Sequence, residues 1–132
     1  MPKHYMPSVH KPLNEYQRAY YRKENGFYHS MKANAKKRGI NFDLNHWEWK
    51  EWFAENHEVC HYCGRPLIIG GGSTNPSTFT IDRMDNKLGY TTINIVGCCM
   101  SCNSGKNKDY TYEEWLHIGE FIKNLRGYEE NT

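Results

Sequence analysis

Two Cys-x-x-Cys pairs constrain the fold of this chain more than any other feature of its sequence. The pairs are Cys60/Cys63 and Cys99/Cys102, and 35 residues separate them. Four thiolates at this spacing can hold one zinc ion in tetrahedral coordination, which leaves no open position for a reacting ligand. The pattern therefore predicts a structural zinc centre that ties together the two ends of the intervening segment.

The fifth cysteine, Cys98, stands directly before Cys99 and could replace it as a ligand. We assign Cys99 to the metal because its three-residue step to Cys102 repeats the step from Cys60 to Cys63. Cys98 is then expected to be a small buried hydrophobic residue. Five cysteines also fit four metal ligands and one spare thiol better than a complete set of disulfides.

Nothing in the sequence indicates a membrane or secreted protein. No apolar stretch approaches the roughly 20 residues that span a bilayer, and the first residues lack the apolar core of a signal peptide. We therefore expect no membrane partner and a cytoplasmic location, where thiols stay reduced. The sequence leaves the oligomeric state open.

Positive charge is concentrated in the N-terminal third of the chain. Residues 1–40 carry nine Lys and Arg against two Glu, although the formal net charge of the whole chain is only +2. This distribution favours a polyanionic partner, namely nucleic acid; the other interpretation is a solvated helix face. The candidate DNA contacts in this region are Lys32, Lys36, Lys37 and Arg38.

Hydrophobic periodicity and capping residues predict two helices in the first half of the chain. Apolar residues at three- and four-residue steps indicate a helix over residues 13–38, which Gly39 would end. Asn45 and Glu48 have the spacing of a capping box that begins a second helix. The aromatic residues of that second helix are expected to pack in the core.

The segment between the cysteine pairs has the pattern of short strands. Residues 66–69 can form one strand, and Phe79 and Ile81 alternate with polar neighbours in another. A short helix is expected from Cys102 to about Lys108. Thr111 and Glu114 form the capping box of a last helix, whose predicted core stripe is Trp115, Ile118, Ile122 and Leu125.

Two polar residues in this region can hold a second cation. Asp82 lies at the end of a predicted strand, and Asn103 follows the zinc ligand Cys102. Zinc would bring these two ends together, and both side chains offer oxygen ligands suited to Mg²⁺ or Mn²⁺. Taken alone, Asp82 can be a turn residue and Asn103 a helix cap, so only their combination within the zinc frame indicates a cation site.

The stretch from Cys60 to Lys106 resembles the HNH endonuclease family, particularly small phage-encoded members. The matching pieces are Cys60-His-Tyr-Cys-Gly, Ile81-Asp-Arg-Met-Asp-Asn, Gly89-Tyr90, Asn94-Ile-Val and Cys99-Met-Ser-Cys-Asn-Ser-Gly-Lys106. The resemblance implies an α+β fold, a small zinc-stabilised, treble-clef-like ββα-metal core with flanking N- and C-terminal helices. It divides the chain into a basic N-terminal helical arm, residues 1–44, and an HNH-like nuclease core with a C-terminal helix, residues 45–132.

The resemblance also implies roles for individual residues. Asp82 and Asn103 would be the ligands of the catalytic divalent cation, and Asn94 would brace the loop that carries the general base. Lys106 would contact a DNA phosphate. The candidate catalytic residues are then Asp82, Arg83, Asp85, Asn94 and Asn103.

The chain departs from the family pattern directly after Asp82. The family usually has a His there as the general base, whereas this chain has Arg83, whose guanidinium stays protonated and cannot accept a proton from water. In one account Arg83 clamps phosphate and Asp85 is the base, because this stretch also resembles the Asp-Arg-Gly-His motif of non-specific ββα-metal nucleases. In a second account His61, Tyr90 or a substrate phosphate helps to activate water. In a third the site is degenerate.

Together these features favour a metal-dependent DNA endonuclease that hydrolyses phosphodiester bonds, with structural Zn²⁺ and catalytic Mg²⁺ or Mn²⁺. The alternative is a catalytically degenerate, zinc-dependent DNA-binding module. A third possibility is a zinc-stabilised protein-interaction domain in which the charge distribution is incidental. The phage resemblance adds the expectation that the protein works in a phage-infected or prophage-carrying bacterial cell.

Overall fold

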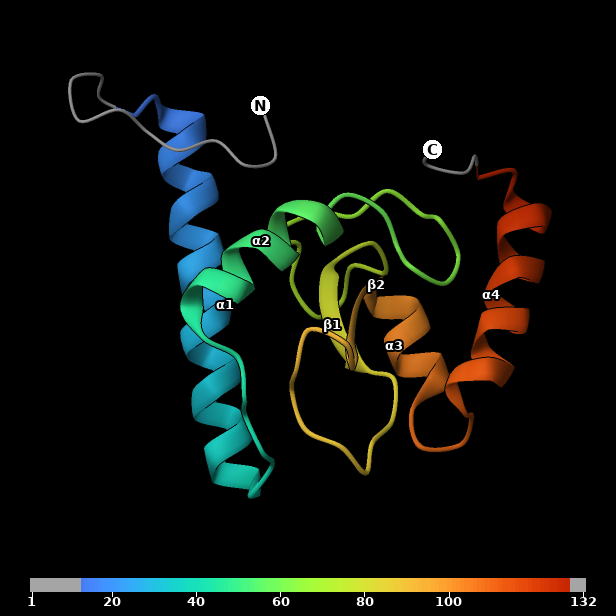
Figure 1. Cartoon of the computed structure of the whole chain (residues 1–132). Coiled ribbons are helices and arrows are strands. Elements are labelled where there is room, and N and C mark those ends of the chain that lie inside the picture. The colour runs from blue at the N-terminus through green and yellow to red at the C-terminus, as the bar shows by residue number, and fades with distance from the viewer. Residues whose placement is uncertain (1–12, 129–132) are drawn as a thin grey trace.

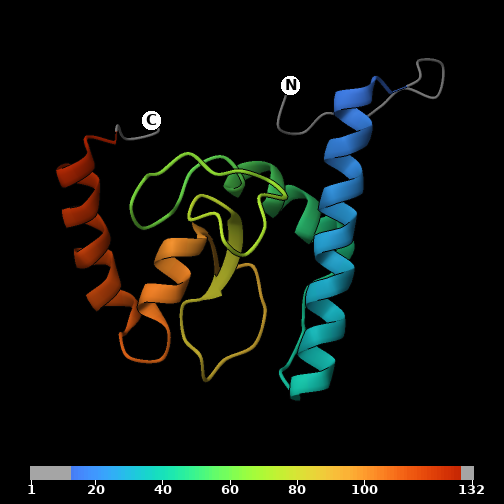
Figure 2. The same ribbon diagram turned by 180° about the vertical axis from the view of Figure 1, so that it is seen from behind.

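The computed structural model describes residues 13–128, and within them four helices surround a two-stranded antiparallel sheet (Figure 1). The elements in chain order are α1 (Glu15–Arg38), α2 (His46–Asn56), β1 (Phe79–Arg83), β2 (Ile95–Cys99), α3 (Met100–Lys106) and α4 (Tyr112–Arg126). Helices α1 and α4 stand on opposite sides of the hairpin in both views (Figures 1 and 2). The predicted α+β class is confirmed, and the part of the N-terminal arm before residue 13 lies outside the described residues.

Helix α1 begins and ends where local sequence rules place its boundaries. The side chain of Asn14 accepts a hydrogen bond from the backbone N–H of Gln17 at 2.8 Å, and the side-chain Oε1 of Gln17 accepts the backbone N–H of Asn14 at 3.1 Å. Gly39 ends the helix in the left-handed region with φ 67°, a conformation that costs glycine little. The last turn carries Lys36, Lys37 and Arg38, and their positive charges interact favourably with the negative end of the helix dipole.

Helix α2 supplies the centre of the main core. Its predicted capping box is present, because Asn45 and Glu48 bond reciprocally at 2.8 and 3.0 Å. Phe53 is fully buried, and its ring lies 5.5 Å from that of Phe79 on β1. Phe27 of α1 packs on the same Phe79 ring at 5.2 Å. The first helix therefore shares one core with α2 and the hairpin.

The hairpin and α3 form a continuous ββα unit. Strands β1 and β2 pair antiparallel with Asp82 opposite Val96 and Phe79 opposite Cys99. Helix α3 follows β2 without a linker, because Cys99 is its N-cap and the Cys99 sulfur accepts the backbone N–H of Cys102 at 3.3 Å. The predicted short helix is thus present, although it starts at Met100 and ends at Lys106.

The predicted strand over residues 66–69 is wrong. Its residues make only isolated bridges, Val59 with Pro66 and Ile68 with Thr78, so no continuous ladder forms. Pro66 has no backbone N–H to donate, and a Gly-rich run follows at residues 70–72. These features interrupt the hydrogen-bonded pairing that a strand requires.

Helix α4 packs against the turn that carries Cys60 and Cys63. Trp115 is buried there, and a Cβ added to Gly119 would come within 2.5 Å of the carbonyl oxygen of Tyr62, so only glycine permits this approach. The predicted core stripe of this helix is only partly confirmed, because Leu125 is 73% exposed. Ile118 and Ile122 are partly buried against the same core as Trp115, and Leu125 in the last turn is the member of the stripe that stays exposed.

Among the described residues, no helix combines the length and the apolar composition that a bilayer crossing requires.

Candidate active site and zinc centre

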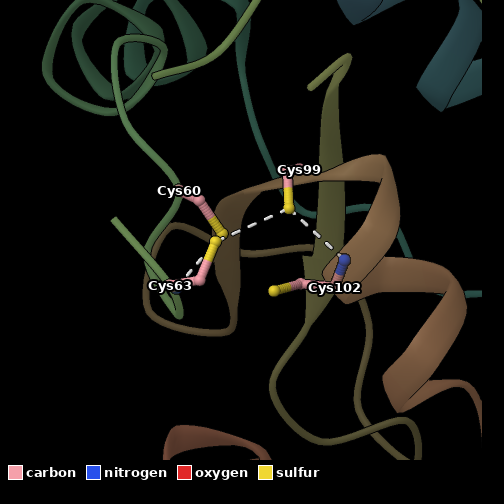
Figure 3. A group of neighbouring side chains, drawn as sticks. All are labelled: Cys60, Cys63, Cys99 and Cys102. Carbon is pink, nitrogen blue, oxygen red and sulfur yellow. Dashed lines mark hydrogen bonds between the residues drawn. The ribbon is translucent and has the colours of Figure 1, made fainter. Parts of the chain in front are cut away.

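The four predicted zinc ligands converge on one point. Figure 3 shows Cys60 and Cys63 reaching from the loop after α2 toward Cys99 and Cys102 at the junction of β2 and α3. The four sulfur atoms lie within 4.8 Å of one another, and all four residues are buried. Tetrahedral zinc with bonds of about 2.3 Å requires sulfur–sulfur separations of roughly 3.8 Å, and the Cys63–Cys99 separation is 3.8 Å. The donor set and its dimensions therefore fit one structural zinc ion.

The backbone around the ligands supports this assignment. The N–H of Cys63 points at the Cys60 sulfur at 3.5 Å, matching the Cys102–Cys99 contact on the other knuckle. Gly64 takes φ 74° and donates its N–H to the Cys60 carbonyl at 2.9 Å, which closes the turn. Amide donors of this kind stabilise the negative charge of a thiolate. Each Cys-x-x-Cys turn therefore favours the deprotonated sulfur that binds a metal.

Cys98 is excluded from the cluster, as expected. It is fully buried, and its sulfur lies 3.4 Å from the hydroxyl of Thr80 on β1. Burial raises the pKa of this thiol well above its usual range. Cys98 is therefore a neutral buried side chain, distinct from the four ligands.

Asp82 sits at the centre of the ββα unit and has two partners. The Tyr62 hydroxyl donates a hydrogen bond to its Oδ2 at 2.6 Å, and the Lys106 ammonium lies 3.1 Å from the same oxygen. Burial, and then the hydrogen bond to Asp82, raises the pKa of the Tyr62 phenol well above its usual range. The phenol is therefore neutral and acts as a donor toward the carboxylate.

Asn103 lies on the helix that faces Asp82. It precedes Lys106 by three residues on α3, and side chains three apart share one helix face. Lys106 reaches Asp82 from this helix, and Asn103 is partly exposed. That Asp82 and Asn103 bind one cation stays a prediction.

Asn94 ties together the loop between the two strands. Its Oδ1 accepts the backbone N–H of Asp85 at 3.0 Å, and its Nδ2 donates to the carbonyls of Asp85 and Gly89 at 3.1 and 2.9 Å. The side chain is 5% exposed. These contacts fix the backbone on which Asp85 stands, and that this loop carries the general base stays a prediction.

Arg83 is directed back into the same loop. Its Nη1 donates to the carbonyls of Asn86 and Leu88 at 3.0 and 2.9 Å, and the guanidinium lies 5.5 Å from the centre of the Tyr90 ring. Contact of Arg83 with a phosphate stays a prediction, and in this structure its Nη1 is bonded within the loop. The guanidinium thus contacts two loop carbonyls through Nη1 and lies near an aromatic face.

Asp85 is the exposed carboxylate next to this site. Its Oδ1 accepts the backbone N–H of Lys87 at 2.9 Å in a local turn. The other carboxylate oxygen has no hydrogen-bond partner among residues 13–128. Asp85 is therefore open to solvent on a loop whose shape Asn94 and Arg83 fix.

The two other candidate bases have different surroundings. His61 Nε2 lies 2.8 Å from the hydroxyl of Tyr112, and burial lowers the pKa of this imidazole while it raises the pKa of the Tyr112 phenol. Tyr90 pairs through its backbone with residues 41–43 and carries the Arg83 guanidinium on its ring. His61 is thus engaged on the α4 side, and Tyr90 supports the loop.

The predicted DNA contacts fall into two groups. Lys32 and Lys36 line a groove of about 570 Å³ between α1 and the segment 39–42, together with His29, Ala33 and the backbone around Phe42. Lys37 and Arg38 are exposed at the end of the same helix. Lys106, by contrast, is 1% exposed and faces Asp82, so it has no access to a phosphate.

Sequence reasoning missed the partners of Asp82. Tyr62 stands between the zinc ligands Cys60 and Cys63, and nothing in its position indicates that its hydroxyl reaches β1. The three-residue step from Asn103 to Lys106 was the available signal, because it places both side chains on one face of a helix. The contact itself depends on how α3 lies against β1.

Comparisons with known proteins bear on the fold of this chain. A scan against models of known protein families finds no match. An uncharacterised protein of Acanthamoeba polyphaga mimivirus, R423, is 34% identical over 99 residues, which are 75% of this chain and 17% of R423. The chain therefore spans less than a fifth of that relative.

Among solved structures, the chain is similar to PacI, a rare-cutting HNH restriction endonuclease whose structure is described in terms of DNA perturbation. The superposition has a TM-score of 0.66 at 25% identity and covers 81% of this chain and 83% of PacI. The resemblance read from the sequence motifs is therefore confirmed, and the chain has the fold of the HNH endonucleases.

Proposed function

We propose that this chain is a metal-dependent DNA endonuclease that hydrolyses phosphodiester bonds. The observation that carries the proposal is its structural match to an HNH restriction endonuclease over most of both chains. The match supports a nuclease-type function and DNA as the partner. The ββα unit with Asp82 facing α3 supplies the site at which such chemistry would occur.

Asp82 and Asn103 are the proposed ligands of the catalytic cation, Mg²⁺ or Mn²⁺. Both partners of Asp82 contact Oδ2, and Oδ1 has no hydrogen-bond partner among the described residues. Carboxylate and amide oxygens are the ligands that these hard cations prefer. A cation bound there would supply positive charge to the scissile phosphate and the leaving oxygen.

Asp85 is the proposed general base. Its carboxylate is exposed three residues beyond Asp82, whereas the guanidinium of Arg83 is bonded to loop carbonyls and cannot take a proton. Asn94 holds the Asp85 backbone from both sides, which would fix the carboxylate relative to the hairpin. Arg83 then supports the loop and does not contact the substrate.

The basic C-terminal part of α1 is the proposed DNA-binding surface. The Lys32–Lys36 groove adjoins the segment whose Asn41 and Asp43 backbones bond to Tyr90 at 2.9 and 3.0 Å. A DNA backbone held on this groove would therefore continue toward the loop that carries Asp85. In this proposal residues 1–44 bind DNA, and residues 45–132 form the zinc-stabilised part that cleaves it.

Two observations favour the second candidate, a catalytically degenerate DNA-binding module. Arg83 replaces the usual base, and the Lys106 ammonium already neutralises the Asp82 carboxylate. A module of this kind would keep the zinc centre and the basic helix and would bind DNA without cleaving it.

The proposed setting is a virus-infected cell, with the protein in its cytoplasm. The matched relative is encoded by a virus of an amoeba, which supports a viral setting in general. The bacteriophage source inferred from the sequence motifs stays a proposal.

A plasmid assay distinguishes the two candidates. Purified zinc-loaded protein is incubated with supercoiled plasmid and Mg²⁺, Mn²⁺ or EDTA, and nicked and linear products are measured. An endonuclease nicks the plasmid only with metal, and Asp82→Ala and Asn103→Ala abolish nicking. DNA retention without nicking under every metal would establish the binding module instead.

Asp85→Asn tests the proposed base in the same assay. The substitution keeps the size and the turn acceptor but removes the basic oxygen, so nicking should fall about 100-fold or more while DNA binding is retained. Asn86→Ala, at a neighbouring exposed loop position, is the control and should nick normally. Unchanged nicking by Asp85→Asn would remove Asp85 from this role.

A further inference from the structure

A buried polar cluster surrounds Asp82. Its two other members, Tyr62 and Lys106, have no role in the catalytic steps proposed above. Asp82 is 9% exposed, Tyr62 is 3% exposed and Lys106 is 1% exposed. Two donors, the Tyr62 hydroxyl at 2.6 Å and the Lys106 ammonium at 3.1 Å, meet on the single oxygen Oδ2. The carboxylate is therefore held in one orientation before any cation or substrate binds.

Lys106 is an unusual choice of partner at a cation site. An isolated ammonium is rarely buried to this extent unless an opposite charge accompanies it. Its only other acceptor among the described residues is the Arg83 carbonyl at 3.5 Å. The Asp82 carboxylate is thus the group that makes burial of Lys106 tolerable, and Lys106 in turn neutralises Asp82.

Tyr62 connects Asp82 to the zinc centre. It stands between Cys60 and Cys63 in the first knuckle, and the knuckle N–H of His61 bonds to the Gly97 carbonyl of β2 at 2.9 Å. The backbone of Tyr62 is also covered by Gly119 of α4. Its phenol is therefore carried on a turn that β2 and α4 hold in place, and its hydrogen bond orients Asp82 relative to the Cys60–Cys63 turn.

We propose that Lys106 is an internal counter-ion of Asp82 and that Tyr62 fixes the orientation of the carboxylate, so that Oδ1 is presented to a divalent cation. This inference rests on the cation site of the proposed function. Both are positioning residues that act through Asp82. A cation that binds Asp82 does so against the ammonium of Lys106, so the free protein binds it weakly.

The two positioning residues have opposite expected effects on cation affinity. Lys106→Gln removes a positive charge next to the ligand, and like charges a few ångströms apart repel strongly, so Mn²⁺ should bind about tenfold tighter or more. Tyr62→Phe keeps the ammonium but frees the carboxylate to rotate, and lost support of a metal ligand typically costs roughly 10–100-fold in affinity. A general loss of folding cannot produce these opposite signs.

Mn²⁺ titration of the zinc-loaded protein without DNA, followed by electron paramagnetic resonance of free Mn²⁺, measures these affinities. Asp82→Asn should abolish binding, and Lys108→Gln, an exposed lysine just beyond α3, should match the wild type. Equal affinities of wild type, Tyr62→Phe and Lys106→Gln, or shifts of the same sign, would overturn the inference. Absence of Mn²⁺ binding in both wild type and Lys106→Gln would instead refute the proposed cation site.

Thermal melting without added divalent cation tests the ion pair independently of any metal bound at Asp82. Lys106→Gln leaves a buried carboxylate without its counter-ion, and the melting temperature should fall by about 10 °C. The double variant Lys106→Gln/Asp82→Asn removes both charges and should recover most of this loss, even if the single variant fails to fold. A double variant no more stable than Lys106→Gln would overturn the counter-ion role.

Discussion

His46, the first residue of α2, places its Nε2 3.1 Å from the Glu24 carboxylate, which lies in the middle of α1 and is 2% exposed. The backbone carbonyl of the same Glu24 accepts the indole N–H of Trp49 at 2.8 Å. Glu24 of α1 thus bonds to α2 through both its own side chain and its own backbone carbonyl. The contact joins the basic helix to the core that carries the hairpin.

Glu24 should make the stability of the folded protein depend on pH. Burial raises its pKa above 4.5, although His46, Lys50 and His29 act in the opposite direction. A raised folded-state pKa means that the contribution of this group to stability is fully present below about pH 4.5 and is lost as the pH rises through the folded value. The stability of Glu24→Gln relative to wild type should therefore increase between pH 4.5 and 8, as measured by urea unfolding.

The direction of this change is the test. If the ion pair with His46 outweighed burial, the relative stability of Glu24→Gln would fall over the same pH interval. Melting curves at several pH values would distinguish the two cases without any assay of activity.

Loss of one zinc ligand should unfold the centre of the molecule. Cys63→Ser removes a thiolate from a buried four-sulfur cluster, and structural zinc contributes on the order of 10 kcal/mol to small domains. We expect less than one zinc per chain by mass spectrometry and loss of the cooperative thermal transition. Cys98→Ala is the control, because this buried cysteine lies outside the cluster; it should keep its zinc while losing some stability.

The loop between the strands depends on Asn94. Asn94→Ala removes three hydrogen bonds and leaves the Asp85 N–H and two carbonyls without their partner, so the free energy of unfolding should fall by roughly 2–4 kcal/mol. Chemical denaturation measures this loss. Asn86→Ala, at an exposed position of the same loop, should change it by less than about 0.5 kcal/mol. Equal effects of the two substitutions would contradict the bracing role.

The basic groove should determine the salt dependence of DNA binding. Each lost phosphate contact lowers the slope of log K against log salt by about 0.9, so Lys32→Gln/Lys36→Gln should reduce it by roughly 2. Fluorescence anisotropy with a labelled duplex at several salt concentrations gives the slope. Lys108→Gln, at an exposed position that does not line the groove, should leave the slope unchanged, and an unchanged slope in the double variant would place the DNA elsewhere.

Much of this architecture could be predicted from short-range patterns. The boundaries of α1 and the start of α2 follow from capping residues and glycine within one turn of each end. The four zinc ligands follow from two equal cysteine spacings. Such features depend on residues three or four apart, and the chain chemistry there is sufficient to fix the local conformation.

The sequence by itself thus determined the four-cysteine centre, the boundaries of α1, the start of α2 and the ββα order. The tertiary structure alone decided that Lys106 turns inward to Asp82, that Tyr62 joins them, and that Arg83 folds back onto its own loop. These contacts link residues 20 or more positions apart or depend on the path of an entire loop. They are set by the pairing of Asp82 with Val96 and by the direction in which α3 leaves Cys99, which no local pattern specifies.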